Sequence, residues 1–350
     1  MASTSDTGAP VERPHHPSGM LDAMKLRMLS LTCALLLTVG ACSDEEKKEA
    51  APKEPGRTTA AQVTAINPLT GATLEQAPKN PVFVVKIDNT PASAPQTAVD
   101  RADLVVEQTV EGGITRLAAL YYSRLPKDVG HVRSMRATDI GIAKPVRGQI
   151  VASGGAGRTI KRIKDAGLKI HSQDAGSKGL SRDDGYAPYN VVVDLATLNQ
   201  DAKNAGPDRP YFQWAAAGAA APKGPAVTSA SVTFSRSHTT NWKFDGKAWK
   251  RTNGTSAREF GARNLVVLWA DEKDAGYTDP AGNPVPETVF AGKGKAVVMV
   301  GGTRVNATWS KANNASTVVL RTADGQVLKL PRGKTWIELV NKGQGAVSAK

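Results

Sequence analysis

Apolar positions along the chain change their spacing several times, and each pattern predicts a different kind of element. A first apolar run covers residues 28–39, about twelve residues, which is too short to cross a bilayer as a helix. The first strand-like segment is VFVVKID at 82–88, and strand-like segments also flank Gly112-Gly113. At 149–167 the pattern predicts a strand, a glycine loop and a short basic helix that ends at Gly167. The first half therefore mixes strands with helices.

The second half has the pattern of antiparallel β structure. Three pairs of strand-like runs flank Asp-Gly or Gly-Gly dipeptides: NWKF-DG-KAWKR, VVLRTA-DG-QVLKL and KAVVMV-GG-TRVNATW. All six tryptophans lie beyond residue 210, and an Ala/Gly/Pro stretch fills 215–227. We therefore predict an α+β or α/β mixed fold. It has an N-terminal mixed-sheet domain with helices at 66–210, a linker at 211–227, and a smaller, mainly antiparallel β domain at 228–342.

The N-terminal segment indicates a lipoprotein signal. Lys25 and Arg27 precede the apolar run, which ends in Val-Gly-Ala before Cys42. A small-residue site followed directly by cysteine is typical of bacterial lipoproteins, and a plain cleaved secretory signal is the alternative. We predict a signal peptide at 1–41, with translation starting at Met20 or Met24. A lipidated Cys42 and a charged, disordered tether at 42–65 would then hold the protein on the extracytoplasmic face of the cell membrane.

Composition excludes several kinds of chemistry. Both cysteines lie within the first 42 residues, so the folded part has no disulfide, cysteine nucleophile or cysteine-ligated zinc. The three histidines after the signal are widely spaced, and the glycines at 154–157 do not form a dinucleotide fingerprint. We therefore expect no metal and no cofactor. The net charge of +13 favours anionic lipid headgroups, anionic wall polymer or peptidoglycan as partners, and in that compartment no nucleic acid. The sequence does not identify a protein partner.

The segment VEGGITR predicts a hairpin that turns on Gly112-Gly113, because a two-residue primed turn needs positive φ. In that register Thr109 faces Arg116. Alternation then places Glu107, Thr109, Glu111 and Arg116 on one face of the sheet. As simple surface ion pairs these charges would contribute about 0–1 kcal/mol each.

Candidate catalytic carboxylates lie in the same half of the chain. Glu107 and Glu111 would be about 13 Å apart along a strand, which exceeds the roughly 5–9.5 Å that a glycosidase pair requires. A catalytic pair therefore needs a partner from another segment. The four candidates are Asp88, Glu107, Glu111 and Asp139.

Polar groups suited to an anionic ligand recur in this half. Guanidinium groups bind carboxylate or phosphate oxygens in pairs, and the glycine loop before the basic helix offers backbone N–H groups. The candidate ligand-binding residues are Asp88, Asn89, Glu111, Thr115, Arg116, Arg133, Ser134, Arg136, Ser153, Gly154, Gly155, Arg182 and Asn190.

The motifs NPLTG, KIDN, EGGITR, VRS, SGG and APYN occur in this order between residues 67 and 190. Together with GKGKAVVMVGGTRVNATWSK and GKTWIELV farther along, they resemble the YerB-like lipoproteins, bacterial envelope proteins of unknown function. The resemblance covers residues 66–340 and implies an α/β N-terminal domain with a smaller C-terminal one. The family pattern often has an aromatic residue or histidine directly before the SGG motif, where this chain has Ala152. It has a histidine after the proline of the APYN motif, where this chain has Tyr189. That departure favours binding over catalysis.

Three functions remain open at this point. The first is a lipid-anchored envelope lipoprotein that binds an anionic or sugar-containing ligand in a polar cleft of the N-terminal domain. The second is a hydrolase or transferase that acts on cell-wall glycopolymers, and the third is a structural or assembly partner of another envelope protein. The anchor, the charge and the arginine-rich segments favour the first.

Overall fold

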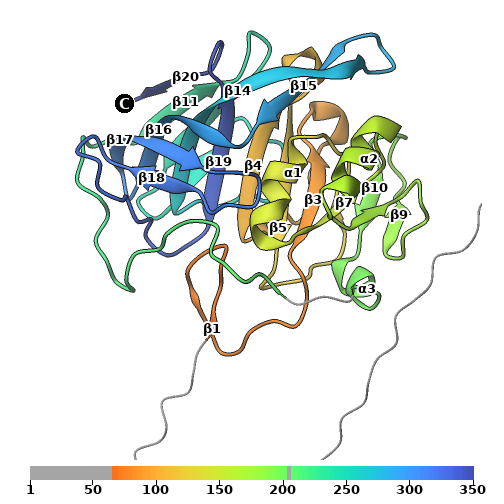
Figure 1. Ribbon diagram of the computed structural model, residues 1–350, viewed down its shortest axis with the longest axis horizontal. Helices are drawn as coiled ribbons and strands as arrows, with labels where there is room; N and C mark the ends of the chain where they lie inside the picture. Colours follow the sequence, from red (N-terminus) through yellow and green to blue (C-terminus); the bar gives the residue numbers. More distant parts are fainter. Residues whose placement is uncertain (1–64, 203–205) are drawn as a thin grey trace, which may run out of the picture. The chain divides into compact units, whose positions relative to one another are not determined.

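The central feature of the fold is one mixed sheet of eleven strands that contains strands from both halves of the chain (Figure 1). The computed structural model describes residues 65–202 and 206–350. The signal peptide, Cys42 and all but the last residue of the predicted tether lie outside this range. Neighbouring strands in the sheet follow the order β18 (Val319–Arg321), β17 (Thr303–Lys311), β16 (Gly292–Val300), β14 (Asn264–Thr278), β19 (Thr335–Asn341), β4 (Leu104–Thr109), β5 (Thr115–Tyr121), β3 (Phe83–Asp88), β7 (Gln149–Ala152) and β8 (Ile170–Ser172), with β15 (Pro284–Val289) paired to β14.

Smaller sheets and short helices complete the fold. The sheets are β1 (Ala65–Ile66) with β2 (Thr73–Leu74); β6 (Val129–Gly130), β10 (Val191–Val193) and β9 (Leu180–Arg182); and β13 (Trp249–Arg251), β12 (Thr239–Phe244), β11 (Ser229–Thr233) and β20 (Ala346–Ala349). The helices are α1 (Asp139–Ala143), α2 (Gly157–Asp165) and α3 (Leu195–Asn199), with 3-10 turns η1 (Pro91–Ser93), η2 (Val99–Arg101), η3 (Glu111–Gly113) and η4 (Lys144–Val146). The predicted mixed α and β class is confirmed.

The parallel pairing of β4 with β19 joins the two halves of the chain. Its register places Glu107 directly beside Glu338. Every residue of β3, β4 and β5 is buried. Strands in this position are covered on both faces, which explains why their sequences are nearly continuous apolar runs rather than alternating ones.

Each face of the central sheet has its own core. On the helical face, Val84, Val106 and Leu120 pack with Ile140 of α1 and Ile163 of α2. Figure 1 shows both helices on one side of β3 and β7. The burial of these apolar side chains is the main stabilising contribution here, at about 25 cal/mol per Å².

On the opposite face, called here the tryptophan face, Val85, Val105 and Leu117 pack with Trp242 and Trp249 of the four-stranded sheet. Trp242 also meets Trp336 of β19 edge-on, with ring centroids 5.2 Å apart. The tryptophans of the second half of the chain therefore form part of a core that the first half shares.

The segment predicted as a linker, 211–227, lies against the helical face. Tyr211 and Phe212 are fully buried there, and Phe212 forms a β-bridge with Val318. The division of the chain into two domains at this segment stays a prediction.

The sequence correctly predicted the backbone conformation of two glycine turns. The Gly301-Gly302 hairpin has the expected two-residue turn, since Val300 pairs directly with Thr303. Gly112 and Gly113 also have the predicted positive φ, +68° and +73°.

The predicted register of the β4–β5 hairpin is wrong by one residue. Thr109 pairs with Thr115, and Gln108 rather than Thr109 faces Arg116. The turn contains three residues, Glu111–Gly113, and is closed by a 2.8 Å hydrogen bond from the Val110 N–H to the Ile114 carbonyl. A one-residue slip moves every side chain to the other face. Arg116 therefore points to the helical face, whereas Glu107 and Thr109 point to the tryptophan face.

Substitutions in this turn should affect stability unequally. A Cβ at Gly112 would have open space around it, whereas one at Gly113 would lie 2.8 Å from Ser235 Oγ. We expect Gly112→Ala to lower the free energy of unfolding by about 1–2 kcal/mol, through the positive φ alone, and Gly113→Ala to lower it further. Urea denaturation measures both. The control is Gly157→Ala at the start of α2, which has open space and should leave stability unchanged or slightly higher. Equal stability of all three variants would contradict the strained turn.

Candidate functional site

Three arginines converge on the helical face at the ends of β3, β4 and β5. We call Arg116, Arg133 and Arg136, with the carboxylates Asp88 and Glu111, the arginine cluster. Glu111 Oε1 accepts a short hydrogen bond from Arg136 Nε, and Glu111 Oε2 lies 3.7 Å from a terminal nitrogen of Arg116. Asp88 Oδ2 lies 3.1 Å from Arg133 Nε. The predicted pairing of Glu111 with Arg116 is therefore present, although it comes from the turn rather than from a shared strand face.

A fully buried ion pair supports the cluster from below. Lys86 Nζ lies 2.7 Å from Asp139 Oδ1, and neither side chain is accessible to solvent. Asp139 also accepts hydrogen bonds from Gln108 Nε2 at 3.1 Å and from the Arg136 backbone N–H at 2.7 Å. These bonds fasten the start of α1 to the sheet. Because buried charges are costly unless paired, removing either partner should be strongly destabilising.

The cluster carries more positive than negative charge. Burial, and then the neighbouring Arg136 and Arg133, lower the pKa of Arg116 to about 10, against the opposing effects of Glu111 and Asp88. Arg116 donates from Nη1 to the Ser134 carbonyl at 3.2 Å. Its Nε is buried and has no hydrogen-bond partner among residues 65–202 and 206–350. Three guanidinium groups thus share two carboxylates.

Arg133 lies at the rim of the cluster. Its side chain is 18% exposed, and its guanidinium stacks 4.6 Å from the centre of the Tyr189 ring. Cation–π stacking of this kind holds the flat guanidinium in a fixed plane. Tyr189 therefore orients Arg133 at the position where this chain departs from the family pattern.

The Ser153–Gly155 loop supports the backbone beside the cluster. The Ser153 N–H donates to the Arg133 carbonyl at 3.1 Å, and the Met135 N–H donates to the Gly154 carbonyl at 3.0 Å. A Cβ at Gly154 would lie 1.7 Å from Asp174 Oδ2, so any larger residue requires the Asp174 side chain to move.

Arg182 and Asn190 bond to each other in the neighbouring segment. Arg182 donates to Asn190 Oδ1 at 2.6 Å, and Asn190 donates to the Asp183 carbonyl at 2.9 Å. These two predicted ligand-binding residues therefore support the loop that carries Tyr189.

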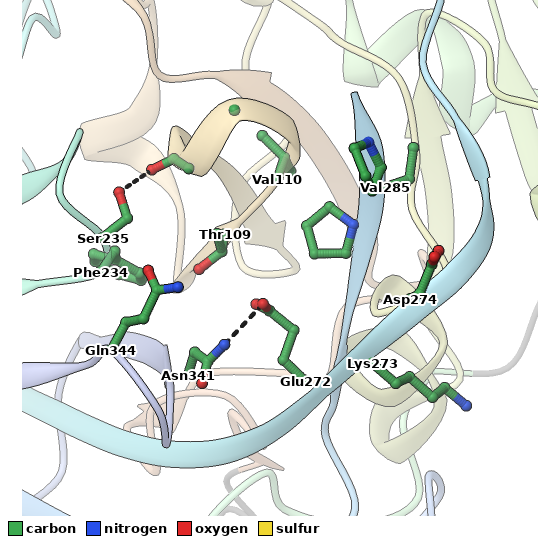
Figure 2. A pocket seen from close by; sticks show the side chains of 14 residues that line it. Thr109, Val110, Phe234, Ser235, Glu272, Lys273, Asp274, Val285, Asn341 and Gln344 are labelled. Atoms are coloured by element: carbon green, nitrogen blue, oxygen red, sulfur yellow. Dashed lines mark hydrogen bonds between the residues drawn. The ribbon is translucent and has the colours of Figure 1, made fainter. Parts of the chain in front are cut away.

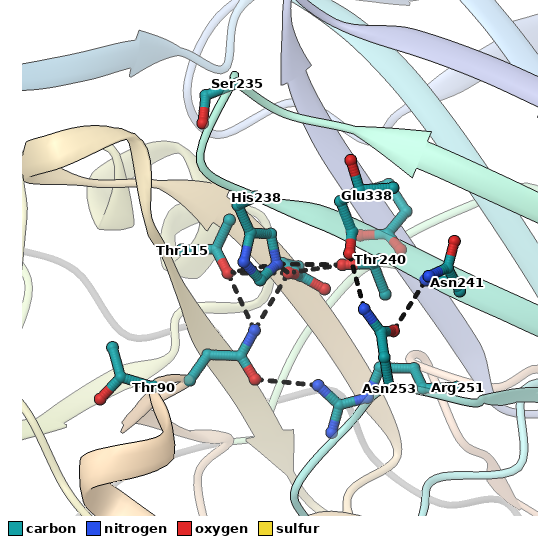
Figure 3. A network of polar contacts seen from close by, with 12 residues as sticks. Thr90, Thr115, Ser235, His238, Thr240, Asn241, Arg251, Asn253 and Glu338 are labelled. Atoms are coloured by element: carbon teal, nitrogen blue, oxygen red, sulfur yellow. Dashed lines mark hydrogen bonds and ion pairs between the residues drawn. The ribbon is translucent and has the colours of Figure 1, made fainter.

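A second polar group lies on the tryptophan face around Glu107. This carboxylate is fully buried, and its Oε1 accepts hydrogen bonds at 2.8–3.0 Å from four donors, which come from β5, β12 and the end of β3 (Figure 3). The donors are Asn89 Nδ2, Thr115 Oγ1, Thr240 Oγ1 and His238 Nε2.

Glu338 of β19 is the fully buried neighbour of Glu107. Burial and the charge of Glu107 raise the pKa of Glu338 well above its usual range. Burial opposes ionisation of Glu107 too, but hydrogen bonds and charge from His238, with Arg251 and Thr115, outweigh it and lower the Glu107 pKa. Two adjacent carboxylates cannot both ionise easily in such a site. We therefore assign one proton to the pair, carried by Glu338, which also accepts from Trp242 Nε1 at 2.6 Å.

The Glu107 network forms the base of a pocket of about 310 Å³, called here the His238 pocket. Its walls include Asn89, Thr90, Ser237, His238, Thr239 and Asn253. Arg251 also lines it, but its guanidinium is held by Glu259 at 2.8 Å and by Asn89 Oδ1 at 2.9 Å. It further stacks 4.8 Å from Trp336.

Another pocket, of about 370 Å³, lies beside the Gly112-Gly113 turn (Figure 2). Thr109, Glu272, Asn341 and Gln344 line it. Burial raises the pKa of Glu272 against the opposing effect of a 2.8 Å hydrogen bond from Asn341. Ser235 also lines this pocket, and its hydroxyl group donates a hydrogen bond to the Gly113 carbonyl of the turn at 2.6 Å.

The structure thus separates the predicted site residues by the face of the sheet. The group on or beside the helical face comprises Asp88, Glu111, Arg116, Arg133, Ser134, Arg136 and Asp139, and the group on the tryptophan face comprises Asn89, Glu107 and Thr115. Four residues of this polar network were not predicted from the sequence: His238, Thr240, Arg251 and Glu338. One signal was available for Glu338, the single charge within the apolar run TWIELV.

Two family models match most of the chain. The N-terminal domain of "Protein of unknown function (DUF3048)" matches residues 69–208, and its C-terminal domain matches residues 230–337. The chain is 26% identical over 345 residues to "Putative lipoprotein YerB" of Bacillus subtilis (strain 168), covering 89% of this chain and 98% of that protein. A crystal structure of the YerB protein from Bacillus subtilis superimposes with a TM-score of 0.68 at 20% identity, over 81% of this chain and 99% of that one.

The chain therefore belongs to the YerB-like family of two-part proteins of unknown function, as the motifs indicated. Within the described residues, no helix is both long and apolar enough to span a membrane.

The shared proton gives a testable pH dependence. A carboxyl group whose pKa is raised by folding stabilises the fold fully below its ordinary value of 4.5, and this contribution is lost as pH rises toward the folded value. We expect Glu338→Gln, which mimics the protonated form, to be increasingly more stable than wild type as pH rises from 5 to 8. The slope attributable to this group should approach about 1.4 kcal/mol per pH unit at most. Urea denaturation across this range measures it.

Two further variants serve as references for that experiment. Glu107→Gln should destabilise the protein by about 3–5 kcal/mol, because four donors and Arg251 lose their buried anion. Glu75→Gln, at an exposed glutamate, should reproduce the wild-type pH profile. If Glu338→Gln gives the same pH profile as wild type, Glu338 is not the group that carries the proton.

Proposed function

We propose that this protein is a lipid-anchored lipoprotein of the cell envelope that binds an anionic or sugar-containing envelope ligand at the arginine cluster. The name of the Bacillus subtilis relative and the signal that ends at Cys42 support the anchor. The observation that carries the binding site is the convergence of three guanidinium groups on only two carboxylates, with Arg133 at the accessible rim.

The geometry favours oxygen-rich anions. Guanidinium groups present planar pairs of N–H donors that match carboxylate and phosphate groups. Glu111 and Asp88 hold the arginines in place before any ligand arrives, which reduces the entropy lost on binding. A ligand anion would also offset the surplus positive charge around Arg116.

The same contacts favour binding over the alternative of an enzyme. Asp88 accepts from Thr90, Ser93 and Arg133, and Asp139 is shared by Lys86, Gln108 and Arg136. Carboxylates whose oxygens already accept hydrogen bonds from several protein donors are poorly placed to act on a substrate as general acids. The catalytic candidates on the helical face are therefore better explained as supports for the arginines.

Arg133→Lys should weaken binding of a purified anionic wall polymer by tenfold or more, equivalent to about 1.5–3 kcal/mol for a charged hydrogen bond. Lysine keeps the charge but lacks the paired donors and the flat surface that stacks on Tyr189. Isothermal titration calorimetry at two salt concentrations measures the affinity. The matched control is Arg321→Lys, an exposed arginine outside the cluster, which should bind like wild type. If Arg133→Lys and Arg321→Lys bind the polymer equally well and melt at the wild-type temperature, the cluster has only a structural role and the proposed binding site is contradicted.

Cys42→Ala should release the protein from the membrane fraction or leave it as an unprocessed precursor, because the thioether-linked lipid supplies the anchor. Fractionation and precursor size on gels measure this outcome, and Cys33→Ala is the matched control within the apolar run. Membrane association that persists in Cys42→Ala would contradict the lipoprotein anchor.

A further inference from the structure

The proposed function leaves the His238 pocket unused. We propose that it is a second ligand site, specific for an uncharged polyhydroxylated group such as one or two sugar units of a glycan, with His238 as its central hydrogen-bonding residue. This site lies on the tryptophan face, so it does not depend on the arginine cluster.

The hydrogen bond to Glu107 fixes the role of the His238 ring. Glu107 Oε1 lies 2.8 Å from His238 Nε2, so this nitrogen carries a proton that it donates to the carboxylate. Nδ1 of the same ring makes no hydrogen bond to any group among residues 65–202 and 206–350. The side chain is 21% exposed and lines the pocket. A hydroxyl group suits this nitrogen because it can either donate a hydrogen bond to it or accept one from it.

Hydrogen bonds within the protein occupy the charged groups around the pocket. Arg251 is bound by Glu259, and Glu107 is ionised beside a protonated Glu338 and accepts four hydrogen bonds. Arg251 lines the pocket, but its guanidinium nitrogens already donate to Glu259, Asn89 and Ser256. An anionic ligand would therefore gain little here, whereas an uncharged polar ligand would avoid a desolvation penalty.

The walls provide the remaining polar contacts. The hydroxyl-bearing residues Thr90, Ser237, Thr239 and Thr255 line the pocket with Asn253, and Pro91 and Ile114 supply small apolar surfaces. A volume of about 310 Å³ is at the small end of ligand sites, which suits one or two sugar rings. Sugars need alternating polar and apolar contacts of this kind because their hydroxyl groups and C–H faces alternate.

The site is also rigid before ligand arrives. Asn253 is fixed by the Asn241 N–H at 2.8 Å and the Thr239 carbonyl at 2.7 Å. Thr255 donates to Gln96 Oε1 at 2.9 Å. Preorganised walls lose little conformational freedom on binding, which favours affinity for a small ligand.

Binding of neutral oligosaccharides tests the proposal. The probes are chitotetraose and maltotetraose, measured by saturation-transfer NMR and calorimetry with the full-length mature chain. We expect at least one probe to bind wild type. His238→Ala should weaken that binding tenfold or more, and Ser237→Trp, which fills the pocket mouth without touching Glu107, should abolish it.

Two controls separate this site from the others. His131→Ala removes a histidine that pairs with Asp183 outside the pocket and should bind the probe like wild type. Arg133→Lys should also bind it normally, so failure of the arginine cluster leaves this result intact. If neither probe binds wild type at millimolar concentration, or if Ser237→Trp binds as well as wild type, the proposal is overturned. Ser237→Trp decides the outcome should His238→Ala fail to fold.

Discussion

The burial of an ionised Glu107 at the centre of the sheet is the constraint on which the rest of this structure depends. A buried carboxylate is stable only when donors surround it, and here they come from β3, β5 and β12. Strand β19, which pairs with β4, contributes a second carboxyl group, Glu338. This group must keep its proton because it lies beside Glu107. Satisfying this one charge therefore requires both halves of the chain to fold together. The parallel β4–β19 pairing and the docking of the four-stranded sheet both serve to surround the buried Glu107 carboxylate.

The same end of the central strands serves two chemically different surfaces. Asp88 and Asn89 are consecutive, as are Thr115 and Arg116, and within each pair the side chains point to opposite faces. One face gathers arginines with a surplus of positive charge, and the other gathers hydroxyl and amide groups around the buried Glu107. The Glu111–Gly113 turn joins them, since Glu111 binds two arginines while Gly113 accepts a hydrogen bond from Ser235. Strand alternation alone is enough to separate the arginine cluster from the His238 pocket.

Local patterns in the sequence predicted the local features of this fold. The mixed α and β class and the positive φ at Gly112 and Gly113 follow from short-range residue chemistry. The contact of Glu111 with Arg116 is present, but it comes from the turn and not from the predicted strand face. The register of β4 and β5 does not, because a two-residue and a three-residue turn both accept Gly-Gly, and the choice reverses each face. His238, Arg251 and Glu338 were not predictable, because His238 and Glu338 contact Glu107, and Arg251 contacts Asn89, only through pairings between residues more than 100 positions apart. No spacing rule encodes such a pairing.

The roles of Glu111 and Arg133 differ although both belong to one cluster. Glu111 is 6% exposed and is fully engaged by Arg116 and Arg136, so it acts as a brace whatever the ligand is. Arg133 has one carboxylate partner, an aromatic support and an accessible edge. In such an arrangement the charges are already ordered when the protein folds. Within the arginine cluster, the contacts of Glu111 are therefore those of a structural brace, whereas Arg133 is the residue left accessible.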